Sequence, residues 1–169
     1  GIAFKADSFT DEGVSVVKAS DIKNLTLRRS DTCLPPDFIE RFAQGVLSAG
    51  EIVLSTVGSV PEVRNSAVGQ MAQVPHEFAG SLLNQNTVVF SPCSSDVLTD
   101  RFLFTVLQTN GYRDHLDLHA HGTANQASLN VSDMLNFFVP LPHPIEQIAI
   151  VGFLSDELKK FDTLTSEAQ

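Results

Sequence analysis

The sequence predicts a single α+β domain, with a twisted, largely antiparallel mixed sheet and flanking helices, followed by the start of a long coiled-coil helix. Three observations predict it. The chain has 169 residues, 43% of them hydrophobic, which is enough for one well-packed core. Short β-branched segments alternate with segments of helical periodicity. Near the end, Pro140, Pro142 and Pro144 interrupt regular structure, and a helical apolar pattern follows. We therefore place a globular domain at residues 1–143 and a helix at 144–169.

Segments rich in β-branched residues and bounded by Gly, Pro or Asn predict strands. In chain order they are residues 14–17, 51–57, 68–74 and 87–90, and residues 116–120 are expected as a further strand. A last extended segment, 135–142, is expected to leave the domain and to stop at the prolines. These strands supply the predicted sheet.

Two internal segments are predicted to be helices. Residues 34–49 begin with prolines and carry Phe38, Phe42 and Val46 at intervals of four, and Gly50 is expected to end the helix. Residues 96–109 repeat apolar side chains at helical spacing. The Asn-Gly pair that follows is expected to terminate this second helix.

The last helix is predicted to start at Pro144, because the first turn of a helix tolerates a residue without an N–H group. Further along, four apolar residues spaced three, four and three apart form a possible coiled-coil seam. They are Val151, Leu154, Leu158 and Phe161. Two interpretations remain open: a terminal helix packed on its own domain, or the start of a longer coiled coil that contacts another subunit.

The charge of the chain excludes a generally basic protein. Its net charge is −9 and its pI about 4.8, whereas nucleic-acid-binding domains are usually basic. Seven of the eleven Lys and Arg residues lie in the first 64 positions, so a local positive face on an acidic body is expected. The sequence contains no phosphate-binding loop, no nucleophile elbow and no dinucleotide-binding turn, so it offers no motif for catalysis or for a nucleotide cofactor.

Cys33 and Cys93 are far apart and show no metal-ligand spacing, so they are expected to be free thiols in a reducing compartment. No apolar run reaches the roughly 20 residues that span a bilayer. No secretory leader is recognisable either. These features predict a cytoplasmic protein.

Several short motifs carry a family resemblance. In order, they are residues 1–5 (GIAFK), 13–22 (GVSVVKASDI), 47–58 (LSAGEIVLSTVG), 84–86 (NQN), 122–126 (GTANQ) and 144–149 (PIEQIA). Together with the Pro-Leu-Pro exit at 140–142, they resemble the target recognition domain of type I restriction–modification specificity subunits. The resemblance covers nearly the whole chain, with the motifs in the same order as in the family.

The resemblance implies sequence-specific binding of double-stranded DNA by a non-catalytic component that directs partner methyltransferase and restriction subunits to their target. No cofactor is expected in this chain, since S-adenosylmethionine, ATP and Mg²⁺ would belong to those partners. The final helix would serve as a spacer between two recognition domains and as a docking surface for the methyltransferase. The chain would then be half of a specificity subunit, or a half-length subunit that forms a homodimer.

Side chains able to read bases or hold phosphates are the expected DNA contacts. Arg pairs with guanine, Asn pairs with adenine, and Lys contacts the backbone. An uncharged His is a further donor or acceptor in the groove. The candidates form three groups along the chain: Lys23, Arg28 and Arg29; Arg64 and Asn65; and Arg113, His119 and His121.

Two other classes of function remain as alternatives. The acidic composition fits a protein-interaction or oligomerisation module without DNA binding. His119 and His121, two residues apart and therefore on one face if both lie in a strand, suggest a small metallohydrolase. A metal site needs three or four convergent ligands, however, and no spaced partner completes one, so no metal site is predicted.

Overall fold

The computed structural model describes residues 1–59, 68–123 and 126–167. Its centre is a sheet of three antiparallel strands, ordered β7 (Met71–Gln73), β5 (Ile52–Ser55) and β9 (Thr87–Phe90). Every residue of β5 is buried, because this strand is covered on both faces. Ile52 and Leu54 point into one core cluster and Val53 into another, as the alternation of a strand requires.

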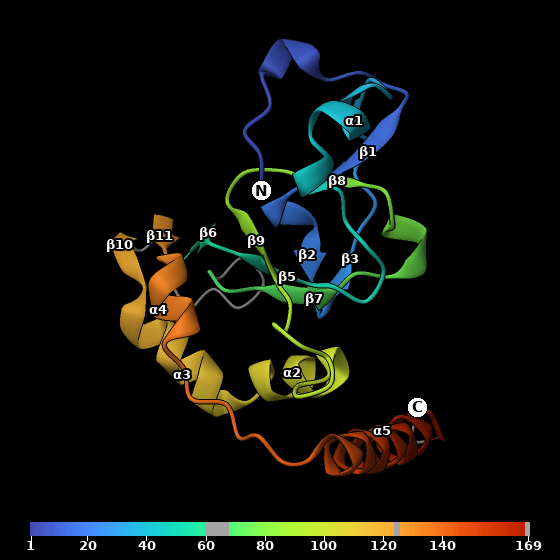
Figure 1. Ribbon diagram of the computed structural model, residues 1–169, viewed down its shortest axis with the longest axis vertical. Helices are drawn as coiled ribbons and strands as arrows, with labels where there is room; N and C mark the ends of the chain where they lie inside the picture. The colour runs from blue at the N-terminus through green and yellow to red at the C-terminus, as the bar shows by residue number, and fades with distance from the viewer. Residues whose placement is uncertain (60–67, 124–125, 168–169) are drawn as a thin grey trace.

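The helices between residues 100 and 135 lie on one side of this central sheet (Figure 1). They are α2 (Asp100–Leu107), α3 (Asn110–His119) and α4 (Val131–Leu135), and they enclose the largest core cluster with β5 and β9. Thr99 and Thr109 cap α2 and α3, because their hydroxyls accept from Phe102 N and Tyr112 N. Only Gln108 and Thr109 separate the two helices, and Thr109 is the N-cap of the second.

The opposite end of the molecule is built from the first part of the chain and from β8. Strand β1 (Val14–Val17) pairs antiparallel with β4 (Cys33–Leu34) and parallel with β8 (Leu82–Leu83). The short helix α1 (Phe38–Arg41) covers them. The hairpin β2–β3 (Ile22–Lys23, Thr26–Leu27) contacts β5 and β7 and shares their second core cluster.

A third small sheet joins β6 (Val57–Gly58) to β11 (Gln126–Ser128) and β10 (His121–Thr123), and it lies beside α3 and α4 in Figure 1. Four short 3₁₀ turns are also present in the described residues. They are η1 (Ala6–Ser8), η2 (Ala19–Asp21), η3 (Ala43–Gly45) and η4 (His76–Phe78). The last element is α5 (Pro144–Glu167), which runs along the outside of α2.

The predicted α+β class is confirmed, and so are the strands at 14–17 and 87–90 and the helix start at Pro144. The sheet is divided into small sheets whose pairings, apart from β1–β8, are antiparallel among the named strands of the described residues. The strand predicted at 51–57 breaks at Thr56, so that β6 joins a different sheet from β5. The strand predicted at 68–74 shortens to β7, because Val68 and Gly69 form a turn.

The long helix predicted at 34–49 is wrong. Only α1 and η3 form there, and Phe42 leaves the helical region at φ −129° and ψ 40°. The reason is tertiary: Val46 pairs with Leu82, and Leu47 N donates to Ser81 O, so this segment is drawn along β8 instead of continuing as a helix. The helix predicted at 96–109 is confirmed in its central part as α2.

The strand predicted at 116–120 is also wrong, because this segment belongs to α3. Tyr112 and Leu116, four residues apart, are both fully buried in the same core cluster, and this spacing fits a helix. Asn110-Gly111, expected to end α2, instead begins α3. The extended exit predicted at 135–142 forms no strand, and residues 136–143 link α4 to α5 without regular structure.

Both cysteines are free thiols. No helix within the described residues is long and apolar enough to cross a membrane.

Candidate nucleic-acid interface

The ends of segment 60–67 are held together beside the β10–β11 hairpin. Gly58 pairs with Ala127, and Val57 pairs with Ser128, which also pairs with His121 on the other side. Val68 N donates to Ser59 O at 2.9 Å, which closes the segment at its base. Arg64 and Asn65, predicted to read DNA, lie outside the described residues.

Arg113 holds the far end of the same segment. Its Nη1 donates to Val68 O at 2.8 Å, and its Nη2 forms an ion pair of 2.8 Å with Asp117 Oδ1 one turn along α3. The side chain retains 30% of its exposure. The guanidinium therefore has a structural role between α3 and Val68, in addition to the DNA contact predicted from the sequence. No sequence pattern indicates this bond, since 45 residues separate the two partners.

The two candidate histidines lie on different elements. His119 ends α3, where its Nδ1 bonds with His115 O at 2.7 Å and its ring centroid lies 4.4 Å from that of His115. His121 begins β10 and is exposed. They do not share a strand face, which removes the geometric basis of the predicted pair. No group of three or more potential metal-ligating side chains occurs in the described part of the chain.

Lys23, Arg28 and Arg29, the first group of candidates, lie at opposite ends of the β2–β3 hairpin. Lys23 lies next to the hairpin turn and lines a cavity of about 180 Å³ together with Val57 and Gly58 of β6. Arg28 and Arg29 are exposed at the open end of the hairpin, where Arg28 N donates to Asp21 O at 2.9 Å. The structure thus brings Lys23 close to β6, which shares a sheet with His121, whereas Arg28 and Arg29 do not line that cavity.

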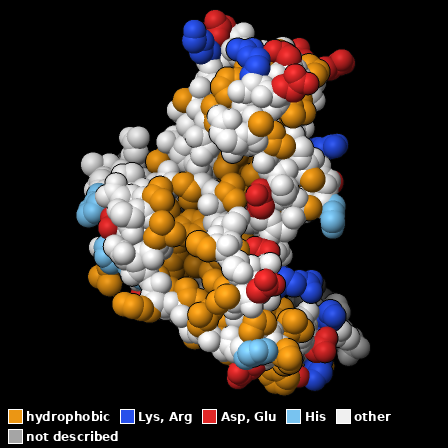
Figure 2. Space-filling view, in the orientation of Figure 1, with side chains coloured by type: hydrophobic (Ala, Val, Ile, Leu, Met, Phe, Trp, Pro, Cys, Tyr) orange, Lys and Arg blue, Asp and Glu red, His pale blue; other side chains and the backbone are white. Residues whose placement is uncertain are grey.

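On the face shown in Figure 2, basic side chains lie mainly toward the two ends of the molecule, with acidic side chains among them. A hydrophobic area lies between them, over the hollow beside α3, α4 and β9. The mixing of acidic with basic side chains on this face is consistent with the net charge of −9. Any phosphate contact on this face would be local and would not form a broad basic band.

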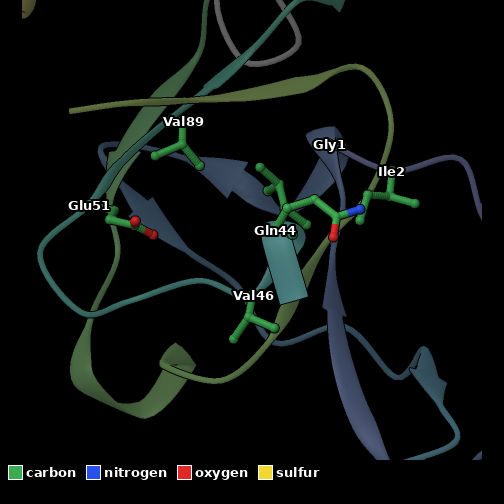
Figure 3. A pocket seen from close by; sticks show the side chains of 8 residues that line it. Gly1, Ile2, Gln44, Val46, Glu51 and Val89 are labelled. Carbon is green, nitrogen blue, oxygen red and sulfur yellow. The ribbon is translucent and has the colours of Figure 1, made fainter. Parts of the chain in front are cut away.

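The cavity drawn in Figure 3 is a weaker candidate for chemistry. It measures about 360 Å³ and is lined mainly by main-chain and apolar groups around Ile2, Val46 and Val89. Its carboxylate, Glu51, already accepts from Ser48 N at 2.8 Å. The lining therefore offers no acid–base pair.

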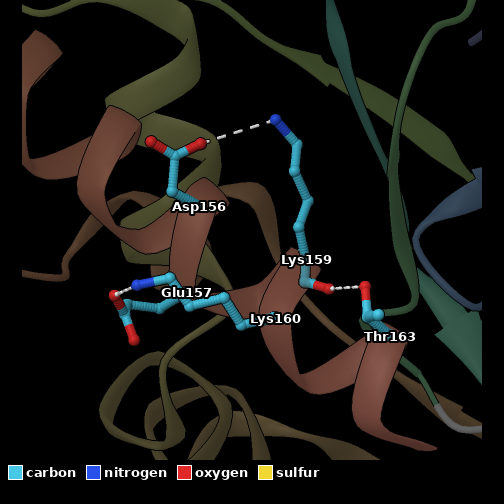
Figure 4. Close-up of polar contacts among 5 residues, drawn as sticks. All are labelled: Asp156, Glu157, Lys159, Lys160 and Thr163. Atoms are coloured by element: carbon cyan, nitrogen blue, oxygen red, sulfur yellow. Dashed lines mark hydrogen bonds and ion pairs between the residues drawn. The ribbon is translucent and has the colours of Figure 1, made fainter. Parts of the chain in front are cut away.

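The predicted seam residues lie along α5. Val151 is half-buried, whereas Leu154 is 39% exposed, and Leu158 and Phe161 are each 64% exposed. The charged side chains of this helix pair locally: Lys159 with Asp156 at 3.5 Å, and Lys160 with Glu157 (Figure 4). The same figure shows Thr163 Oγ1 donating to Lys159 O at 2.9 Å. Beyond its first turns, α5 thus presents apolar side chains to solvent.

A family model described as "Type I restriction modification DNA specificity domain" matches residues 2–169. The chain belongs to this family. It is 26% identical over 166 residues to the specificity subunit of the type I restriction enzyme MjaVIII from Methanocaldococcus jannaschii. That match covers 97% of this chain and 36% of the relative.

Two solved structures have the same fold. A chain from a study of complex assembly and conformational transition of the type I R-M system superposes with a TM-score of 0.69 at 20% identity, covering 99% of this chain and 37% of that one. The HsdS subunit from Thermoanaerobacter tengcongensis superposes with a TM-score of 0.63 at 20% identity, with coverages of 92% and 39%. The chain thus spans a little over a third of the length of each relative.

Proposed function

We propose that this chain is a target recognition domain that binds a specific sequence in double-stranded DNA and directs the partner subunits of a type I restriction–modification system to it. The observation that carries the proposal is the family match over residues 2–169, supported by a fold shared along almost the whole chain. Within the described residues, the cavity around Ile2, Val46 and Val89 offers no acid–base pair, and no potential metal cluster is found.

The arrangement around β6 supports this function. His121 on β10, Lys23 in the cavity beside Val57 and Gly58, and the Arg113 bond to Val68 all lie in the β6 sheet or next to it. Side chains projecting from one small sheet can enter a groove together, and a groove contact of this kind discriminates between base pairs. Arg28 and Arg29, at the open end of the hairpin, would contact phosphates and set the register.

The net charge of −9 limits what this domain does alone. Phosphate neutralisation by Lys and Arg supplies much of the affinity for DNA, so we expect weak binding by the isolated domain and tight binding only in the assembly. We place methyl transfer, with S-adenosylmethionine, and DNA cleavage, with ATP and Mg²⁺, in partner subunits, and no catalytic step in this chain. We also place the assembly in the cytoplasm, and we keep 143/144 as the domain boundary.

The test is selection from a randomised duplex library by this domain bound to its methyltransferase partner, at low and at near-physiological salt. Enrichment of one short motif that survives the added salt is the expected result. An Arg28→Ala and Arg29→Ala double variant should weaken binding to all sequences, whereas Arg64→Ala should relax the selected motif.

The matched control is Arg41→Ala, which removes a positive charge at a distant site. Arg41 lies 4.4 Å from the ring centroid of Phe38 and pairs with Asp37 at 3.3 Å, so it is already engaged on α1. Equal losses from Arg41 and Arg64 would contradict the placement of the reading surface. Selection of no motif, with the partner demonstrably bound, would favour the interaction module that the exposed apolar side chains of α5 also suggest.

A further inference from the structure

The side chain of Gln147 is completely buried where α5 leaves the domain. Its Oε1 accepts from Thr99 N at 2.9 Å. Its Nε2 donates to Val97 O and to Pro142 O, both at 2.8 Å. A glutamine amide has two N–H donors and one carbonyl acceptor, so both donors and the acceptor are used.

These three bonds join three separate segments. Thr99 caps α2, Val97 precedes it, and Pro142 lies in the irregular link between α4 and α5. The start of α5 is therefore tied to the start of α2 and to its own entry segment through one side chain. Hydrogen bonds depend on angle as well as distance, so a set of three fixes a direction as well as a contact.

Apolar packing constrains the direction of α5 relative to the domain less than these hydrogen bonds do. A groove of about 460 Å³ runs between α2 and α5, lined among others by Phe104, Val151 and Lys159. Ile148, the neighbour of Gln147, is 65% exposed. Apolar contact is not directional, and an open groove leaves room for a helix to tilt. The buried amide, whose bonds are strengthened by a low local dielectric, is the stronger constraint.

We propose that Gln147 is a positioning residue that fixes the direction of α5 relative to the globular domain. Resting on the function proposed above, this contact sets where bound DNA lies relative to subunits docked on α5. Replacing the amide should release the angle of the helix and leave the recognition surface beside β6 intact, since the bonds of Gln147 go to Thr99, Val97 and Pro142.

The direct test is the distance between two spin labels, one on the exposed Cys93 and one on a cysteine introduced by Lys160→Cys, in a Cys33→Ser background. The parent protein should give one narrow distance distribution. Gln147→Glu removes both donors and sets a carboxylate against two carbonyl oxygens. Gln147→Met keeps the approximate shape without polar groups. Both should broaden the distribution or shift its mean.

Gln108→Glu is the matched control, because Gln108 is exposed and its Nε2 reaches only Phe104 O within α2. It should leave the distribution unchanged. Hydrogen exchange of the Thr99 amide distinguishes loss of this bond from a general loss of packing. It should be faster in Gln147→Met than in Gln147→Glu, since only glutamate retains an acceptor for Thr99 N.

A measurement without any substitution at Gln147 covers the case in which those variants fail to fold. The side-chain amide protons of Gln147 should exchange much more slowly than those of Gln108. Equal rates, or an unchanged distance distribution in both folded variants, would overturn the proposal. None of these readings uses DNA, so a failure of DNA recognition would leave them unaffected and would be seen separately in the duplex selection.

Discussion

Arg113 shows how one side chain can serve both the fold and a candidate site. It connects α3 to Val68 and pairs with Asp117. Arg113→Ala should lower the free energy of unfolding by about 1–3 kcal/mol, because it leaves the Val68 carbonyl without its partner. The partly exposed ion pair adds little to this. Urea unfolding measures the change.

Arg101→Ala is the control for this experiment, since Arg101 lies exposed on α2. A surface change of this kind should alter stability by less than about 0.5 kcal/mol. If the two variants unfold at the same urea concentration, the bond from Arg113 to Val68 does not stabilise the domain.

Tyr112 provides a pH-dependent test. It is fully buried, its OH donates to Met134 O at 3.3 Å, and burial raises the pKa of its phenol above the ordinary value of 10.0. The folded state therefore holds the phenol proton more tightly than the unfolded state. The resulting stability is complete below pH 10 and is lost as the pH rises beyond it, by about 1.4 kcal/mol per pH unit.

Tyr112 is the only tyrosine in a chain without tryptophan, so phenolate absorbance reports on it alone. The absorbance should rise together with unfolding and not before it. Below pH 10, the free energy of unfolding of Tyr112→Phe should differ from that of the parent protein by a constant amount. Above pH 10, it should fall less steeply with pH than in the parent protein. A phenolate that forms near pH 10 while the protein stays folded would contradict the burial argument.

Among the elements, the β2–β3 hairpin has a conformational strain that can be removed. Asn24 and Leu25 form its turn at φ 52° and 64°, a region that favours Gly or Asn and disfavours Leu. Leu25 is 46% exposed, so its side chain gains little from burial. Leu25→Gly should raise the free energy of unfolding by about 0.5–1 kcal/mol. Thermal or chemical unfolding measures it.

Leu118→Gly is the opposite control. Leu118 is 81% exposed in the last turn of α3, where glycine should cost up to the roughly 1 kcal/mol that it costs inside a helix. The two leucine-to-glycine changes should therefore have opposite signs. A loss of stability in both would mean that the contacts of the partly exposed Leu25 side chain outweigh the strain of the turn.

At the scale of the whole molecule, α5 extends beyond the domain with apolar side chains in solvent, which is the arrangement expected of a helix that contacts a second helix. Leu158→Glu should abolish or weaken by at least about tenfold the association with a second copy or with the methyltransferase partner. Sedimentation velocity measures both.

Leu118→Glu is the matched control, since Leu118 is an equally bulky exposed residue away from α5. It should leave association unchanged. Equal effects of the two glutamates would contradict the assignment of the apolar seam of α5 as the association surface.

The sequence by itself determined the α+β class, strands β1 and β9, the core of α2, the start of α5 and the family. These are local features: β-branched runs, helical periodicity, a proline at a first turn, and short motifs in a fixed order. Each depends on residues near one another in the chain, where spacing reports conformation directly.

Only the tertiary structure decided the elements whose conformation depends on distant partners. Val46 follows β8 and not a helix because Leu82 lies across from it, and β6 leaves β5 because β11 offers a second sheet. The roles of Arg113 and Gln147 are of the same kind, since their bonds cross 45 to 50 residues at Val68 and Val97. The spacing of apolar residues along the chain does not predict such bonds, because they form only when the core brings separate segments together.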